Sequence, residues 1–180
     1  MTKYRNLIIT GIISAAALAS GACAPDQTAE AANVSSESAT STLRIDCASL
    51  EENSEQEAQL MFTFSEAAGK MRSADFTNIS DIAPTRRQEV SDLLRQQFTA
   101  LSGKSDLTMS TVENIHDSTL RGNVESLARL EKQFVDQNRE TPVQYFDATL
   151  DVEKLISANN TYQDQWNTLH ETITTTCANR

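Results

Sequence analysis

Residues 84–103, PTRRQEVSDLLRQQFTALSG, contain the signals of a complete amphipathic helix. Pro84 suits a first helical position, and Thr85 with Gln88 forms a capping box at the same end. The large apolar side chains then recur at helical spacing and share one face, which consists of Val90, Leu93, Leu94, Phe98 and Leu101. Because Gly103 is typical of a helix end, the pattern predicts a helix that stops there and buries one face.

Before this helix, the sequence predicts another one that begins at a capping box. Ser49 with Glu52 and Ser54 with Glu57 are alternative starts, and the helix ends near Arg72. Its apolar face consists of Met61, Phe64, Ala68 and Met71. Residues 73–83 form a loop whose apolar side chains are expected to pack over one end of the fold, namely Phe76, Ile79 and Ile82.

Two more helices are predicted after Gly103. Ser110 with Glu113 is a capping signal, and the stripe after it contains Val112, Ile115, Leu120, Val124, Leu127, Leu130 and Phe134. Thr141-Pro142-x-Gln144 is the clearest helix start in the chain. The apolar face that follows reaches Ile173, and Asn159-Asn160 is a position where this helix either kinks or divides.

These stretches predict an all-α fold, an antiparallel bundle of four helices over residues 43–180. No internal repeat and no long alternating run is present, although Thr42–Asp46 is compatible with one short extended piece. Cys47 and Cys177 lie at the two ends of the predicted domain and are expected to form a disulfide, the alternative being two free thiols. A bundle with an even number of antiparallel helices brings its two ends together, which agrees with that pairing.

The charge balance excludes several classes of partner. The chain has 15 Lys and Arg against 25 Asp and Glu, for a net charge of −10. Removal of residues 1–22, which contain Lys3 and Arg5 and no acid, makes the remainder still more negative. Such a protein repels nucleic-acid phosphate and anionic head groups, and Arg86-Arg87 is the only adjacent basic pair, so we expect no nucleic-acid binding.

The N-terminus has the pattern of a signal peptide at residues 1–22. Lys3 and Arg5 precede a mostly apolar stretch from Leu7 to Ala19, which is too short to cross a bilayer as a stable helix. An uncleaved membrane anchor is the alternative interpretation. The pattern predicts export from the cytoplasm.

The next residues, Ala19-Ser20-Gly21-Ala22-Cys23, resemble the lipobox of bacterial lipoproteins. This resemblance implies that Cys23 carries a diacylglycerol on its thiol and an acyl chain, such as palmitate, on its amine. Ala24 in place of Asp implies the outer membrane, with the domain facing the periplasm. Ser20 departs from the Leu that most lipoboxes have there, which leaves ordinary signal-peptidase cleavage after Ala22 or Ala24 as the alternative. Beyond residue 23 the chain resembles no family specifically.

Residues 24–42 are expected to form a disordered linker. Val34 is their only large aliphatic side chain, so the segment has too little apolar surface to offset the entropy lost on folding. Together with Cys23, this linker would hold the domain near the membrane.

The candidates for a metal site are few. Glu113-Asn114-Ile115-His116 resembles half of the ligand set of a ferritin-type bundle, and the second histidine, His170, has Asn167 where the matching acid would stand. Haem ligation by His116 and His170, or by one of them with a methionine, is the related hypothesis, and the methionines concerned are Met61, Met71 and Met109. We expect no metal and no cofactor.

No motif for nucleophilic catalysis or phosphate binding is present. Elimination leaves a non-enzymatic envelope lipoprotein whose helical domain binds or scaffolds an unidentified protein partner near the membrane. The aromatic side chains of the last predicted helix are expected to be core packing; the alternative is a contact patch in which Tyr145 and Tyr162 are the exposed members. The alternative function is a metal- or haem-binding bundle that uses His116 and His170.

Overall fold

The computed structural model describes residues 34–71 and 74–178. The predicted signal peptide at 1–22, the lipid-accepting Cys23 and residues 24–33 of the linker lie outside this range. The fold is all-α, as predicted. The described part contains five long helices, and these are α2 (Val34–Glu51), α3 (Ser54–Met71), α4 (Pro84–Val112), α5 (Ser118–Asn138) and α7 (Val152–Ala178). Two short elements complete it, a 3-10 turn at Ile79–Asp81 and α6 (Thr141–Phe146).

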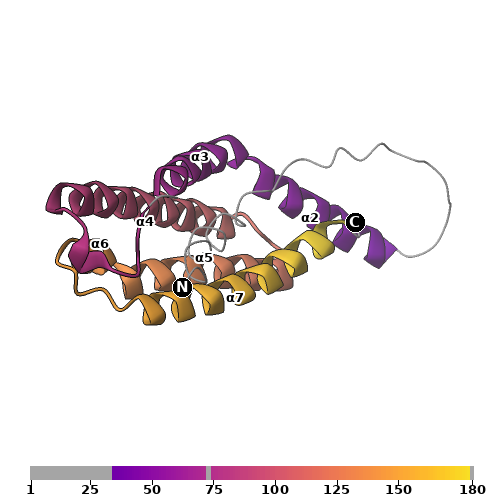
Figure 1. Cartoon of the computed structure of the whole chain (residues 1–180). Coiled ribbons are helices and arrows are strands. Elements are labelled where there is room, and N and C mark those ends of the chain that lie inside the picture. The colour runs from indigo at the N-terminus through magenta and orange to yellow at the C-terminus, as the bar shows by residue number, and fades with distance from the viewer. Residues whose placement is uncertain (1–33, 72–73, 179–180) are drawn as a thin grey trace.

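The long helices form an elongated body in which α3 packs on α4, α4 on α5, and α5 on α7 (Figure 1). These four helices run alternately in opposite directions along the body. The short helix α6 packs against α4 at one end of the body, and α2 contacts α7 at the other.

The fifth long helix corrects the sequence prediction. Residues 34–42 were expected to be disordered and Thr42–Asp46 extended, whereas both segments lie in α2. The physical reason is visible in the sequence: Leu43, Cys47 and Leu50 recur at helical spacing, and all three belong to the larger core cluster. One face of α2 is therefore held by tertiary packing, which outweighs the weak helix propensity of its serines and threonines.

Helix α4 also differs from its prediction, because it continues past Gly103 to Val112. A Cβ at Gly103 would lie 3.1 Å from the Leu60 side chain, so this glycine lets α3 and α4 approach closely and does not end the helix. Ser110 therefore lies in the last turn of α4, and Glu113 is its C-cap. Helix α5 begins later, where the Asp117 side chain accepts a hydrogen bond from Leu120 N at 2.7 Å.

The last predicted helix is divided, though not at Asn159-Asn160. Its break lies between α6 and α7, where Ala148 has a φ of 56°, the one positive φ among the described non-glycine residues. Asn159 is buried within the continuous helix α7. Tyr145 is fully buried, as core packing of the aromatic side chains predicts, and it donates a hydrogen bond to the carbonyl of Asp75 at 2.9 Å.

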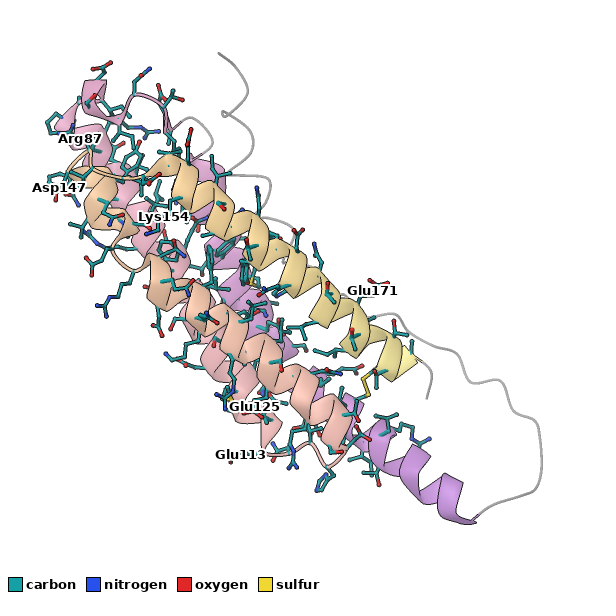
Figure 2. All side chains as sticks on the ribbon, turned by 90° about the horizontal axis from the view of Figure 1, so that it is seen from below. Arg87, Glu113, Glu125, Asp147, Lys154 and Glu171 are labelled. Atoms are coloured by element: carbon teal, nitrogen blue, oxygen red, sulfur yellow. A yellow bond between two sulfur atoms is a disulfide. The ribbon has the colours of Figure 1, made fainter. Side chains whose placement is uncertain are left out.

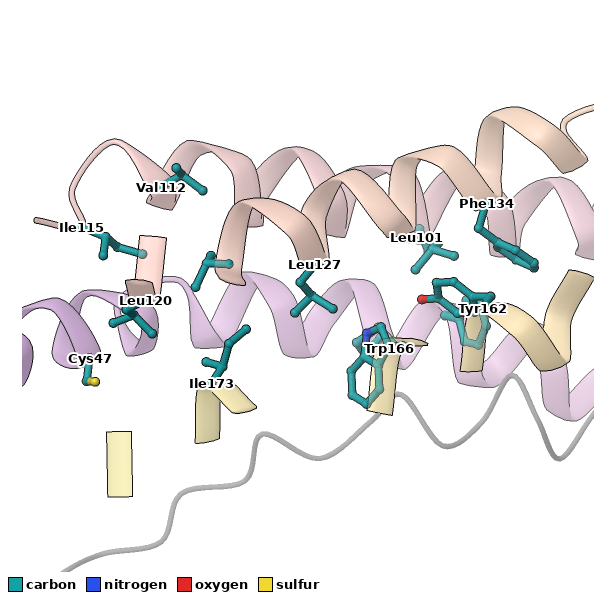
Figure 3. Packing of buried hydrophobic residues seen from close by; sticks show 14 residues of the cluster. Cys47, Leu101, Val112, Ile115, Leu120, Leu127, Phe134, Tyr162, Trp166 and Ile173 are labelled. Carbon is teal, nitrogen blue, oxygen red and sulfur yellow. The ribbon is translucent and has the colours of Figure 1, made fainter. Parts of the chain in front are cut away.

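The buried side chains form two clusters. The smaller one lies at the α6 end, where Phe76 and Ile79 are buried and Ile82 packs against them, as the sequence predicts. The larger one runs along the body and joins all five long helices (Figure 3). Tyr162 and Trp166 of α7 face Leu101, Leu127 and Phe134 in it. Tyr162 is buried, which rules out the alternative that it is exposed for a contact, and it stacks on Phe134 with ring centroids 4.4 Å apart.

The predicted disulfide between Cys47 and Cys177 is confirmed. It joins α2 to the last turn of α7, with Cα atoms 5.7 Å apart and a sequence separation of 130 (Figure 2). The first and last described helices are thus covalently connected.

Candidate functional site

The structure does not bring the predicted metal candidates together. Glu113 directly follows α4, at the end of the helix far from Arg87 (Figure 2). Helix α4 ends at Val112, so His116 is not part of it. His116 pairs with Asp46 of α2, whereas His170 stacks on Trp166 of α7. Within residues 34–71 and 74–178, no group of three or more His, Cys, Asp or Glu side chains has an arrangement that could hold a metal ion.

Asp46 fastens α2 to the turn between α4 and α5. Its buried carboxylate accepts hydrogen bonds from His116 N at 2.9 Å and Asp117 N at 2.6 Å, and His116 Nδ1 lies 3.1 Å from its other oxygen. Burial opposes ionisation of this carboxyl, but the two backbone N–H groups and the His116 ring outweigh burial and hold the pKa of Asp46 below 3.8. Because Asp46 and the disulfided Cys47 are adjacent, α2 is held on two sides.

The most unusual group in the molecule is a charged network inside the larger cluster. The Lys104 ammonium of α4 contacts the Glu131 carboxylate of α5, and their side chains are 3% and 0% exposed. Trp166 of α7 donates its indole N–H to the same Glu131 oxygen at 3.0 Å. The Glu57 carboxylate of α3 lies 3.4 Å from the Lys104 ammonium. This buried charged network, Lys104, Glu131, Trp166 and Glu57, therefore takes one side chain from each of four helices.

Burial dominates the electrostatics of this network. It raises the pKa of the Glu131 carboxyl above its ordinary value of 4.5, and attraction to Lys104 offsets part of that effect. Burial and the Glu131 charge also raise the pKa of the Tyr162 phenol. The second Glu131 oxygen and the Tyr162 hydroxyl are buried and have no hydrogen-bond partner among the described residues. Burying charge at this depth is costly unless each group keeps its partner.

His170 lies beside the network. Its ring stacks on Trp166 with centroids 4.5 Å apart and an interplanar angle of 14°. The Lys104 ammonium lies 5.8 Å from the centroid of the Trp166 ring. Burial and the Lys104 charge lower the pKa of His170 below 6.5, although Glu57 partly opposes them. His170 Nε2 is buried and has no hydrogen-bond partner among the described residues.

The network was not predicted from the sequence, although a signal for it exists. Glu131 stands in the spacing Val124, Leu127, Glu131, Phe134, and Lys104 follows Leu94, Gln97 and Leu101 in the same rhythm. Two opposite charges therefore occupy core positions of neighbouring helices. A charged residue at such a position is seldom fully buried unless it is paired, so the pattern indicates an internal ion pair.

Two spaces lie between helices of the described part of the chain. A cavity of about 20 Å³ lies where the two clusters meet, and its lining includes Gln97 and Asn159, each of which has a buried polar atom without a hydrogen-bond partner among the described residues. That space suits about one water molecule. An open groove of about 550 Å³ follows α5 and α7, with Leu130 and Leu169 among polar side chains. Neither space contains a charged side chain of the buried network.

Comparison with known proteins gives no relative, because no protein-family model, no curated protein and no solved structure matches the chain. Among the helices that the structure describes, none is both long and apolar enough to cross a bilayer. What the site can do is therefore inferred from its geometry alone. Lys104 and Glu131 are shielded from solvent, so the arrangement holds four helices together and does not present a reactive group to a substrate.

Proposed function

We propose that this protein is an exported, lipid-anchored, non-enzymatic protein whose helical domain holds a partner protein close to a membrane of the cell envelope. The observation that carries the proposal is the disulfide between Cys47 and Cys177. Disulfides of this kind persist in oxidising compartments such as the periplasm and are rare in the cytosol. The disulfide therefore supports the same compartment as the signal-like residues 1–22 and the lipobox-like segment ending at Cys23.

Anchoring gives the domain a physical role that requires no active site. Attachment at Cys23 would confine the domain to a thin layer above the membrane and raise its effective concentration toward a partner in that layer. More than one acyl chain on the same residue makes such attachment durable. The outer membrane, with the domain in the periplasm, is the location that we propose.

The outer face of α3 is the surface that we propose for the partner. Helix α3 packs on α4, and Phe62 on its other side is 64% exposed, more than Ile45 and Val143, the other exposed large apolar side chains of the described residues. Gln59 and Glu66, one turn away on either side, are also exposed. An aromatic side chain surrounded by polar ones is a common centre of protein contacts.

The anchor is tested with Cys23→Ser in cells fed a labelled fatty acid. The natural chain is expected to carry the label and to sediment with membranes, whereas Cys23→Ser loses the label and remains in the soluble fraction. Cys177→Ser is the matched control, because it removes a thiol of the same chain and is expected to keep the label. A natural chain without label, with an N-terminus generated by ordinary signal-peptidase cleavage, would contradict the anchor.

The partner is tested with a photo-reactive amino acid at position 62 in intact cells. A discrete cross-linked product is expected from position 62, and its yield should fall several-fold when Cys23→Ser is added, because confinement to the membrane is lost. The control is the same amino acid at position 132, an exposed site on α5. Equal products from both positions, or no product from position 62, would count against a partner on α3.

A further inference from the structure

His170 lies against the only tryptophan in the chain, and the surroundings of the two rings favour a neutral imidazole. One face of the Trp166 ring system stacks on His170, and the Lys104 ammonium lies 5.8 Å from the ring centroid. A proton on His170 would therefore place two cations around one indole. The folded arrangement resists that second charge.

The charged groups that face this pair come from three other helices. Lys104 of α4 repels a charged His170, and Glu57 of α3 attracts it, although Glu57 already lies 3.4 Å from Lys104. Glu131 of α5 contacts Lys104 and accepts the Trp166 N–H. Its second oxygen has no hydrogen-bond partner among the described residues, and neither does the neighbouring Tyr162 hydroxyl. Both carboxylates of this set, Glu57 and Glu131, therefore interact with Lys104 and not with His170 alone.

Hydrogen bonding leads to the same conclusion. Both ring nitrogens of a protonated histidine are donors, whereas a neutral ring needs only one. His170 Nε2 is buried without a hydrogen-bond partner among the described residues, so a proton there would be a buried donor without an acceptor. A buried donor without an acceptor is unfavourable, whereas the same donor can bond to water, so protonation favours a ring that has moved into solvent.

We propose that His170 is a proton-operated latch: its neutral ring stacks on Trp166 and covers the buried charged network, and its protonation releases the ring to solvent. Helix α7 remains held at its far end by the disulfide at Cys177, so the opening is local and reversible. The latch belongs to the domain itself and depends on neither the anchor nor the partner proposed above. It would make the packing of α7 respond to mild acidification.

The lowered pKa of His170 in the folded state sets the direction in which stability changes with pH. A histidine whose pKa is lower in the folded state than in the unfolded state binds fewer protons when folded. Its contribution to stability is therefore complete above pH 6.5 and is lost as the pH falls toward the lower folded value. Release of the ring lets His170 regain its proton, so the open form gains population over the same range.

The test uses the purified protein, which contains two histidines and one tryptophan. Proton NMR of the two imidazole rings and Trp166 fluorescence are recorded from about pH 8 to about pH 5. The expected result is that the His170 ring titrates with a midpoint below 6.5 and that Trp166 emission changes with the same midpoint. Far-UV circular dichroism should stay constant over this range, because the helices remain folded.

Three variants separate the latch from other causes. His170→Gln is expected to abolish the fluorescence titration, and His116→Gln, which alters the other histidine of the chain, is expected to leave it unchanged. Glu57→Gln should move the midpoint to lower pH, because the Glu57 carboxylate favours a charged ring. Either of two results overturns the proposal: a His170 midpoint at or above 6.5 in the natural protein, or a fluorescence titration that persists in His170→Gln.

Discussion

Replacing both Cys47 and Cys177 by alanine is expected to lower the free energy of unfolding by about 5 kcal/mol, the value that the chain-entropy model gives for a loop of this length. The bond closes a loop with a sequence separation of 130, so its loss greatly enlarges the set of unfolded conformations. Most small domains have a total stability of about 5–15 kcal/mol, so the change is large enough to approach unfolding at physiological temperature. Urea denaturation followed by circular dichroism measures it.

The natural protein in a strong thiol reductant serves as the control for this pair of substitutions. It should lose a similar amount of stability, because reduction removes the same cross-link without changing the packed side chains beyond the two sulfurs. A loss below about 1 kcal/mol in both samples would show that packing of Leu43 and Leu50 already holds α2 in place and that the cross-link adds little.

Replacing Lys104 by methionine should lower stability by about 3–5 kcal/mol, because it leaves the Glu131 carboxylate buried without its cation. The loss should grow as the pH rises. Burial already raises the pKa of Glu131, and removal of Lys104 takes away a group that lowers this pKa. The folded state therefore favours the protonated carboxyl more than the unfolded state does. Stability is consequently lost as the pH rises from the unfolded-state pKa of Glu131 to its higher folded-state pKa. Urea denaturation at several pH values measures both effects.

Two comparisons isolate the buried pair. The double variant Lys104→Met with Glu131→Leu should recover most of the stability, since apolar side chains of similar size need no partner. Arg129→Met removes a cation from the exposed i,i+4 pair with Glu125 on α5 and should change stability by roughly 0.5 kcal/mol or less. If Lys104→Met were no more harmful than Arg129→Met, the internal pair would have no special role.

The helical class of the protein and most of its long helices follow from local patterns. The starts of α3 and α4, the helix start at Thr141-Pro142 and the packing of Phe76 were all predictable from signals that lie close together in the chain. Helices α4 and α6 nevertheless begin with a proline at the first or second position and without the predicted side-chain cap hydrogen bond. The disulfide is also predictable, because the predicted helical domain has one cysteine near each end and therefore a single pairing within it.

The errors arise where distant contacts override local signals. Gly103 resembles a helix end, yet its missing side chain serves the approach of Leu60 from another helix. Helix α2 was missed because distant contacts stabilise it. It packs into the larger core cluster, and Asp46 accepts hydrogen bonds from backbone N–H groups that are 70 and 71 residues further along the chain. The apolar spacing of Leu43, Cys47 and Leu50 is present in α2, but the partners that hold these residues and Asp46 lie in distant parts of the chain.

The central network was missed for a related reason. Lys104 and Glu131 belong to different helices, and only the fold shows that they meet in a space that Trp166 closes. The sequence nonetheless shows that both residues stand at core positions in the helical spacing of apolar side chains in α4 and α5. The metal candidates show the reverse case, a local pattern that the fold does not use. The spacing Glu113-x-x-His116 suggests two ligands on one helix face, but α4 ends at Val112 and Glu113 is its C-cap.

The cross-link between α2 and α7 also changes what a broken backbone would mean. From Cys47 to Cys177 the polypeptide is a covalent ring, from which one arm leaves toward the N-terminus and a short tail leaves toward the C-terminus. A single proteolytic nick anywhere inside the ring leaves both fragments joined, so no piece diffuses away. Tension applied between the two termini likewise bypasses the ring and passes directly through two sulfur atoms, which leaves the four central helices unstretched.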